Sequence, residues 1–183
     1  GNPMIYEFDG LKPVIAPSAF ISESAVIIGD VRVGEDCYIG PGAILRADSH
    51  GMPIIIGNGS AIEEGVIIHV GGRGTNGCCI GERVTIGHGA IVHANRIADN
   101  ANIGMGAVIS LYSTIGSYAI VAEGAVVKQA QVIPDRVVVG GAPAKILREL
   151  EDRDIATWDK TKLWYIELAR KYTTPGVLKR LDI

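Results

Sequence analysis

Residues 97–127 read IADNANIGMGAVISLYSTIGSYAIVAEGAVV, and this stretch contains the pattern that decides the fold. Every sixth residue is aliphatic: Ile97, Ile103, Ile109, Ile115, Val121 and Val127. Four residues after each of the first five, the side chain is small: Ala101, Ala107, Ser113, Ala119 and Ala125. A period of six fits neither an amphipathic helix nor a single alternating strand, so it predicts short strands separated by tight corners.

The same six-residue step extends towards the N-terminus with three slips. It accounts for Ile15, Ile21, Ile27, Val33, Ile39 and Leu45, then Ile56, Ile62 and Ile68, then Ile80, Ile86 and Val92, and after residue 127 for Ile133 and Val139. Five extra residues lie between Leu45 and Ile56, and six lie between Ile68 and Ile80; one residue is missing before Ile97. We interpret the two insertions as loops that leave the register of the coils intact.

Glycine often follows the aliphatic position, as at Gly104 and Gly116, where a corner needs a permissive backbone. Three six-residue units then complete one triangular coil, with the aliphatic and small side chains inside. We therefore predict an all-β fold, a parallel β-helix of hexapeptide repeats over residues 4–144. Residues 145–173 change period and predict one or two amphipathic helices, and residues 174–183 are expected to form a tail.

Composition narrows the classes of function. Seventeen Lys and Arg against 20 Asp and Glu give a formal net charge of −3, so we expect no nucleic-acid partner. No run of 18 apolar residues is present, so we expect no membrane span. The three cysteines suggest no disulfide framework and the start shows no secretory signal, so the expected compartment is the reducing cytoplasm.

The register of the coils brings three polar residues together on the outside of one face. Arg46, His69 and His93 each follow an aliphatic position that falls on the same face in successive coils. Adjacent strands lie roughly 4.8 Å apart, so His69 and His93 are predicted to lie one above the other. Two imidazoles at that spacing can bind the same metal ion.

His88 is predicted to lie around a corner from this column, on the preceding face, where it does not reach the same ion within one chain. A threefold trimer brings that face of one subunit against the histidine column of the next. In the same construction Glu64 lies one coil before His88 and meets Arg46 across the interface as an ion pair. We therefore predict a homotrimer with metal sites between subunits.

The sequence resembles the gamma-class carbonic anhydrases, in particular the bacterial hexapeptide-repeat branch of phenylacetate- and carnitine-operon-type proteins. The matching stretches are residues 44–48 (ILRAD), His69, residues 86–93 (IGHGAIVH), residues 103–107 (IGMGA) and residues 140–145 (GGAPAK). The resemblance implies a left-handed winding, a homotrimer and Zn²⁺, with Fe²⁺ or Co²⁺ as alternatives, bound by His69, His88 and His93. It also implies a structural role for Arg46 and Asp48 near the interface, and reversible hydration of CO2 to bicarbonate by metal-bound hydroxide.

One motif departs from that family. Where the family has Asn-x-Gln-Asp, this chain has Ala61-Ile62-Glu63-Glu64. Glu64 keeps a carboxylate for Arg46, and Glu63 places a carboxylate near the expected metal, where it could act as a general base. Tyr112, one coil after His93 on the same face, is a second candidate for the catalytic pocket, and His50 is a weaker candidate for proton relay.

Other functions remain open at this point. Hexapeptide folds also host acyltransferases, and a metal site of this kind could hydrolyse acyl-CoA thioesters. The changes at residues 61 and 63 are also compatible with a catalytically weak or inactive homologue that only holds metal. Cys78 and Cys79 are a minor alternative metal site, because no further cysteine lies at a Cys-x-x-Cys spacing.

Overall fold

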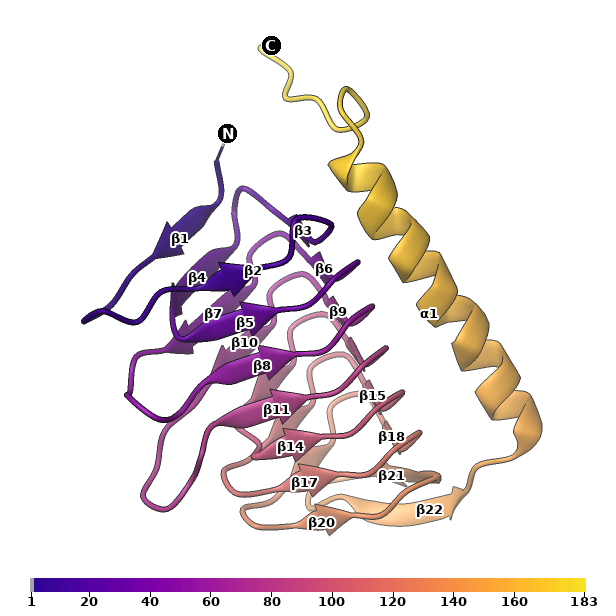
Figure 1. Ribbon diagram of the computed structural model, residues 1–183. Coiled ribbons are helices and arrows are strands. Elements are labelled where there is room, and N and C mark those ends of the chain that lie inside the picture. Colours follow the sequence, from indigo (N-terminus) through magenta and orange to yellow (C-terminus); the bar gives the residue numbers. More distant parts are fainter. Residues whose placement is uncertain (1) are drawn as a thin grey trace.

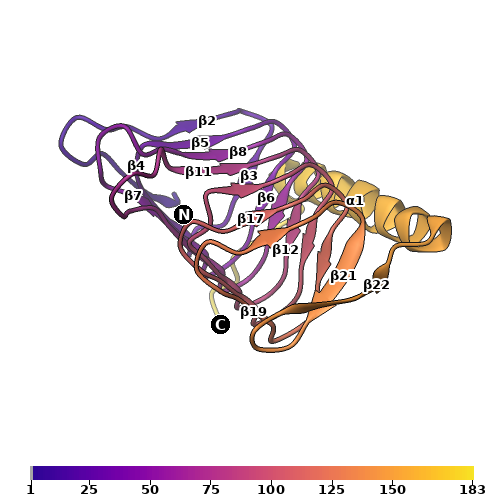
Figure 2. The same ribbon diagram turned by 90° about the horizontal axis from the view of Figure 1, so that it is seen from below.

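The computed structural model describes residues 2–183, which form a triangular prism flanked by one long helix (Figures 1 and 2). The first sheet contains β1 (Met4–Tyr6), β4 (Val26–Gly29), β7 (Ile44–Ala47), β10 (Ile67–His69), β13 (Ile91–Val92), β16 (Val108–Ile109) and β19 (Val126–Val127). The second contains β2 (Val14–Ile15), β5 (Val31–Val33), β8 (Ile54–Ile56), β11 (Cys78–Ile80), β14 (Arg96–Ile97), β17 (Thr114–Ile115) and β20 (Val132–Ile133). The third contains β3 (Phe20–Ile21), β6 (Tyr38–Ile39), β9 (Ala61–Ile62), β12 (Thr85–Ile86), β15 (Asn102–Ile103), β18 (Ile120–Val121), β21 (Val137–Gly140) and β22 (Lys145–Glu149).

The chain visits the three sheets in turn and winds as a left-handed parallel β-helix, which confirms the predicted fold (Figure 1). Each aliphatic residue of the six-residue step pairs with its equivalent in the next coil. Ile68, for example, lies opposite Leu45 on one side and Val92 on the other. All three side chains are completely buried. Burial of each such side chain stabilises the fold by about 1.5–3 kcal/mol, so the repeated column is the main source of stability.

The two insertions lie outside the coils and pack against each other at their bases. Residues 48–53 connect β7 to β8, and residues 70–77 connect β10 to β11. The Cys78 N–H donates to the Pro53 carbonyl at 2.9 Å. Gly77 has φ +106°, and a Cβ atom there would lie 2.2 Å from the same carbonyl oxygen. Glycine is therefore required where the second insertion rejoins the prism.

The C-terminal segment corrects one boundary of the sequence prediction. Residues 145–149, predicted as the start of the helical segment, instead form β22, which pairs antiparallel with β21. The strand covers backbone groups that β21 would otherwise leave unpaired at the end of the third sheet. A single helix, α1 (Asp152–Thr173), follows, and Glu151 and Asp154 close its N-terminus with a capping box.

Helix α1 runs along the outer face of the third sheet (Figures 1 and 2). Near the N-terminal end of the prism, Tyr172 stacks on Phe20 with ring centroids 4.6 Å apart, and Tyr165 contacts Tyr38 at 5.5 Å. Arg170 and Asp36 form a two-pronged ion pair beside these rings. The third face of the prism is thus covered within one chain. No helix among residues 2–183 is both long and apolar enough to cross a membrane.

A buried lysine ties the middle of α1 to the third sheet. The side chain of Lys162 is only 2% exposed, and its Nζ donates to Asn102 Oδ1 at 2.7 Å, Thr85 Oγ1 at 3.2 Å and the Ala101 carbonyl at 3.3 Å. Burial lowers the pKa of this amine from 10.5 to about 7. The three oxygens accept the hydrogens of the ammonium group. Because the group is removed from water, its charged form is nevertheless disfavoured.

This arrangement predicts a pH dependence of stability. With a folded-state pKa of about 7 against 10.5 unfolded, the folded protein binds fewer protons than the unfolded chain between these values. The free energy of unfolding therefore rises with pH across this window, by up to about 1.4 kcal/mol per pH unit. Urea unfolding followed by circular dichroism from pH 7 to 8.5 should show the rise in wild type and in the exposed control Lys160→Met, and its loss in Lys162→Met. At higher pH the buried Cys37 and Cys78 thiols, whose pKa burial raises from 9.0 to about 11 and about 12, act in the opposite direction. Identical pH profiles for wild type and Lys162→Met would refute it.

Candidate metal centre

Arg46, His69 and His93 form one outward column on the first sheet, as the six-residue step predicts. Strand β10 places His69 directly beside Arg46 of β7. His93 follows Val92, the partner of Ile68, and so lies beside His69 on the other side. The two imidazole rings have centroids 4.9 Å apart and planes inclined by 33°. The distance is the strand spacing of a sheet, and the pair follows directly from the stacking of coils.

The ring nitrogens of this pair converge below the second insertion. A Cβ atom at Gly71 would lie 3.9 Å from the Nε2 atoms of both His69 and His93. The His93 Nε2 is buried and has no hydrogen-bond partner among residues 2–183. A buried imidazole nitrogen without a partner is costly unless something else occupies its lone pair. The absence of a side chain at Gly71 leaves space next to both nitrogens, and this fits a bound metal ion.

The surroundings of the pair disfavour the protonated form of both imidazoles. Burial and the nearby Arg46 guanidinium lower the pKa of His69 and of His93, and the His93 ring lowers the pKa of His69 further. Arg46 is itself fixed by Asp48, whose Oδ2 accepts from Nη1 at 2.7 Å. Asp48 Oδ1 lies 3.9 Å from His69 Nε2. Only the neutral ring can donate a lone pair to a metal, so the burial that disfavours protonation keeps both rings available as ligands, while Asp48 offsets the positive charge of Arg46 beside them.

His88 lies in the turn between β12 and β13, at the corner where the third sheet meets the first. Its Nε2 is 3.2 Å from Glu63 Oε1 and its Nδ1 is 3.6 Å from Glu64 Oε2. Both carboxylates come from the equivalent turn one coil earlier. This position changes one detail of the predicted subunit contact. The third sheet was expected to meet the next subunit, but α1 covers it. His88 is instead exposed at the corner between the third and first sheets.

Glu63 is the buried carboxylate beside His88. It is only 5% exposed, and it receives a hydrogen bond from Tyr165 of α1. Burial raises the pKa of Glu63, while the Tyr165 hydroxyl and His88 act in the opposite direction. The same contacts raise the pKa of the Tyr165 phenol. The pair Glu63–Tyr165 therefore holds a buried carboxyl group within reach of the His88 ring.

No single chain contains a complete metal site. Among residues 2–183, no group of three His, Cys, Asp or Glu side chains is close enough to hold one ion. His69 and His93 supply two nitrogens, and His88 is around the corner from them. The sequence prediction that His88 reaches the ion only from another subunit thus remains a prediction, and the geometry of the isolated chain agrees with it.

A ladder of aliphatic side chains lies on the outside of the first sheet, two residues before the polar column on each strand. Its members lie opposite one another in successive coils: Met4, Val26, Ile44, Ile67, Ile91, Val108 and Val126. Ile44, Ile67 and Ile91 are 38%, 40% and 45% exposed. No element among residues 2–183 packs over this ladder, in contrast to the third sheet under α1. A continuous exposed apolar stripe of this kind is typical of an interface.

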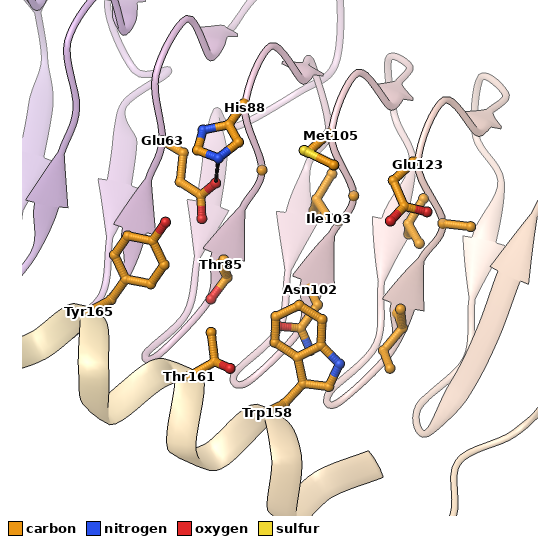
Figure 3. Close-up of a pocket in the computed structure, with 15 residues that line it drawn as sticks. Glu63, Thr85, His88, Asn102, Ile103, Met105, Glu123, Trp158, Thr161 and Tyr165 are labelled. Atoms are coloured by element: carbon orange, nitrogen blue, oxygen red, sulfur yellow. Dashed lines mark ion pairs between the residues drawn. The ribbon is translucent and has the colours of Figure 1, made fainter.

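A pocket of about 290 Å³ opens between α1 and the third sheet, next to His88 (Figure 3). Figure 3 shows Glu63 and His88 on one side of it and Glu123 on the other, with Trp158, Thr161 and Tyr165 projecting from the helix. The strands contribute Thr85, Asn102, Ile103, Ile120 and Val121, and the turn after β15 contributes Met105. The corner that carries His88 therefore adjoins a space lined mainly by apolar atoms.

The remaining candidates lie outside this centre. The Tyr112 hydroxyl donates to the Arg73 carbonyl at 2.7 Å, so Tyr112 holds the loop that contains Gly71 over the two histidines. His50 is exposed and lies 3.1 Å from Asp9. Cys78 is buried and Cys79 exposed, and both are free thiols.

Sequence reasoning missed two residues that α1 brings to the site, Tyr165 and Trp158. A signal was present: Trp158, Lys162, Tyr165, Ala169 and Tyr172 follow one another at alternating steps of four and three, which is one face of a helix. Because most of these residues are polar or aromatic, the pattern of aliphatic residues in the sequence did not identify this face of the helix.

Comparisons with known proteins agree with this architecture. Residues 12–47 match the family model "Bacterial transferase hexapeptide (six repeats)". A crystal structure of a Bacillus cereus protein, named as a candidate acetyltransferase, has a TM-score of 0.90 and 34% identity, covering 95% of this chain and 99% of that one. A hexapeptide transferase family protein from Anaplasma phagocytophilum gives a TM-score of 0.85 at 30% identity, covering 92% and 98%.

Two curated relatives are similar over most of the chain. Gamma carbonic anhydrase 2 of Arabidopsis thaliana mitochondria is 36% identical over 163 residues, which are 87% of this chain and 58% of the relative. The chain thus spans less than two thirds of that protein. The carnitine operon protein CaiE of Escherichia coli K12 is 41% identical over 150 residues, 82% of this chain and 74% of the relative. The chain therefore belongs to the family of hexapeptide-repeat proteins that includes CaiE, and it is similar to the gamma carbonic anhydrases.

Proposed function

We propose that the protein is a metal-dependent, carbonic anhydrase-like enzyme that acts as a homotrimer and hydrates CO2 reversibly. The observation that carries the proposal is the pair His69 and His93, with converging Nε2 atoms and a buried His93 nitrogen that lacks a partner. His88 of an adjacent subunit supplies the third nitrogen. Three neutral imidazoles suit Zn²⁺, and also Fe²⁺ or Co²⁺. When bound, such an ion lowers the pKa of water towards about 7 and so supplies the nucleophile for CO2.

The aliphatic ladder supports the homotrimer. It runs along the same sheet as His69 and His93, so a neighbour that covers it also approaches the two histidines. In a closed ring of three copies, the corner of one subunit that presents His88 meets the first sheet of the next. Arg46 and Asp48 line this contact, and Glu64, whose side chain is 45% exposed, is proposed to pair with Arg46 of a neighbour. The expected ion pair then fixes the register of assembly.

Glu63 is proposed as the proton acceptor. Hydration of CO2 releases one proton for each bicarbonate formed, and a nearby group has to take it up and pass it to solvent. Glu63 Oε1 lies 3.2 Å from His88 Nε2. Burial raises the pKa of Glu63, so its carboxylate is a stronger proton acceptor than an exposed one. Tyr165 positions the carboxylate through its hydrogen bond. Tyr112 acts as a positioning residue for the loop above the histidines, and its place at the border of the catalytic pocket stays a prediction.

A second candidate is acyl transfer or thioester hydrolysis on acyl-CoA. Two observations favour it: the pocket beside His88 is larger than CO2 requires, and a similar solved structure is named as a candidate acetyltransferase. The lining of that pocket contains carboxylates but no Lys or Arg side chain to bind the phosphates of coenzyme A. A third possibility, a metal-holding homologue with weak activity, is distinguished from the first by assay of CO2 hydration.

Elemental analysis tests the ligands. The wild-type protein should contain about one divalent metal per chain, and His69→Ala, His88→Ala and His93→Ala should each lose it, because two imidazoles alone bind far more weakly than three. His50→Ala, an exposed histidine outside the centre, is the matched control and should keep its metal. Full retention by His88→Ala would contradict a ligand from the neighbouring subunit.

Multi-angle light scattering tests the interface. Ile67→Glu and Ile91→Glu place a charge in the aliphatic ladder and should convert trimer to monomer with loss of metal, while circular dichroism remains unchanged. Val132→Glu is the control, since Val132 is also aliphatic, outward-facing and on a strand, but lies on the second sheet with 71% exposure. If Ile67→Glu and Ile91→Glu remain trimeric, the ladder is not the interface.

Stopped-flow CO2 hydration on metal-loaded protein tests the chemistry. Glu63→Gln keeps the shape but cannot accept a proton, and should lower kcat by about 10²-fold or more with metal content unchanged. Tyr165→Phe should have a smaller effect in the same direction. A wild-type protein that is fully loaded yet inactive would exclude the carbonic anhydrase reaction and favour the metal-holding homologue.

A further inference from the structure

The pocket beside α1 has features that hydration of CO2 does not use. It extends from His88 past Met105 to Glu123, with Trp158 of the helix facing the strands (Figure 3). The outward-facing side chains of Met105, Ile120 and Ala122 form its apolar surface on the prism. A pocket with apolar walls and a few polar groups at its ends is suited to a small organic molecule.

The charged groups of the pocket restrict the sign of such a ligand. Glu123 is exposed and forms no ion pair with any of residues 2–183, and Glu63 is the second carboxylate in the lining. No Lys or Arg side chain lines the space. The nearest buried cation, Lys162, donates its hydrogens to Asn102, Thr85 and the Ala101 carbonyl, so it is directed towards the sheet. An anionic ligand would meet unpaired negative charge, whereas a cationic one would be attracted.

We propose that this pocket binds a small organic ammonium ion with an apolar chain. The ammonium group pairs with the Glu123 carboxylate, and the chain lies against Ile120 and Ala122. The Trp158 ring provides an aromatic wall for the alkyl chain, and since Lys162 Nζ lies 5.6 Å from its centroid, the ring contributes apolar contact and Glu123 the charge. The site needs neither metal nor an adjacent subunit's histidine, so it stands independently of the CO2 chemistry. The region next to the metal centre thus binds a separate class of ligand.

Tryptophan fluorescence measures the binding directly. The chain has two tryptophans, and Trp164→Phe leaves Trp158 as the only reporter. Titration at pH 8 uses three probes of similar length: n-pentylammonium, 1-pentanol and pentanoate. Lys162 carries little charge at this pH because its pKa is about 7. We expect a saturable change with n-pentylammonium and at least roughly tenfold weaker binding of the alcohol and of the anion, as expected for loss of a charge-paired contact.

Two variants in the Trp164→Phe background assign the contact. Glu123→Gln removes the charge with little change of shape and should weaken n-pentylammonium binding about tenfold, without affecting 1-pentanol. Glu35→Gln, an exposed carboxylate outside the pocket, should bind as the parent does. Equal binding of ammonium and alcohol, unchanged binding by Glu123→Gln, or no saturable signal with n-pentylammonium would each overturn the proposal. Elemental analysis of the same samples shows separately whether the metal centre is intact.

Discussion

The stacking of each coil directly on the one before it is the constraint on which the rest of the structure depends. Because the aliphatic residues Leu45, Ile68 and Val92 lie opposite one another, the residues that follow them are also aligned. The 4.9 Å separation of the His69 and His93 rings is therefore a consequence of sheet spacing. The metal centre needs no special backbone geometry beyond the repeat, and the insertions leave the alignment unchanged.

The three outer faces of the prism differ, and this difference determines where other molecules bind. The third face is covered by α1 through stacked aromatic rings and the buried Lys162. The second carries charged residues such as Arg32 and Arg96. The first presents an uncovered aliphatic ladder next to the two histidines. In the proposed trimer, covering the ladder removes apolar surface from water, and the same contact brings a neighbour's corner near His69 and His93.

Much of this arrangement could be predicted from the sequence because a repeat has few degrees of freedom. Once the six-residue step was known, the column of Arg46, His69 and His93 followed by counting. The segment 145–149 was misassigned because its pattern is compatible with a helix, and only the open edge of β21 selects a strand. The Glu63–Tyr165 contact was not predictable, since it depends on how α1 docks on the third sheet.

The central claim is that the metal site is shared between two subunits, and a mixing experiment tests it most directly. Trimers made only of His88→Ala chains or only of His93→Ala chains are expected to lack metal. In every mixed trimer, however, His69 and His93 of a His88→Ala chain meet His88 of a His93→Ala chain at one contact and form one intact site. Refolding the two variants together in equal amounts should restore about one quarter of a metal ion per chain, as random assembly into rings of three requires. Restoration to this level supports the shared site. A mixture as free of metal as its parents, although mixed trimers have formed, would contradict it.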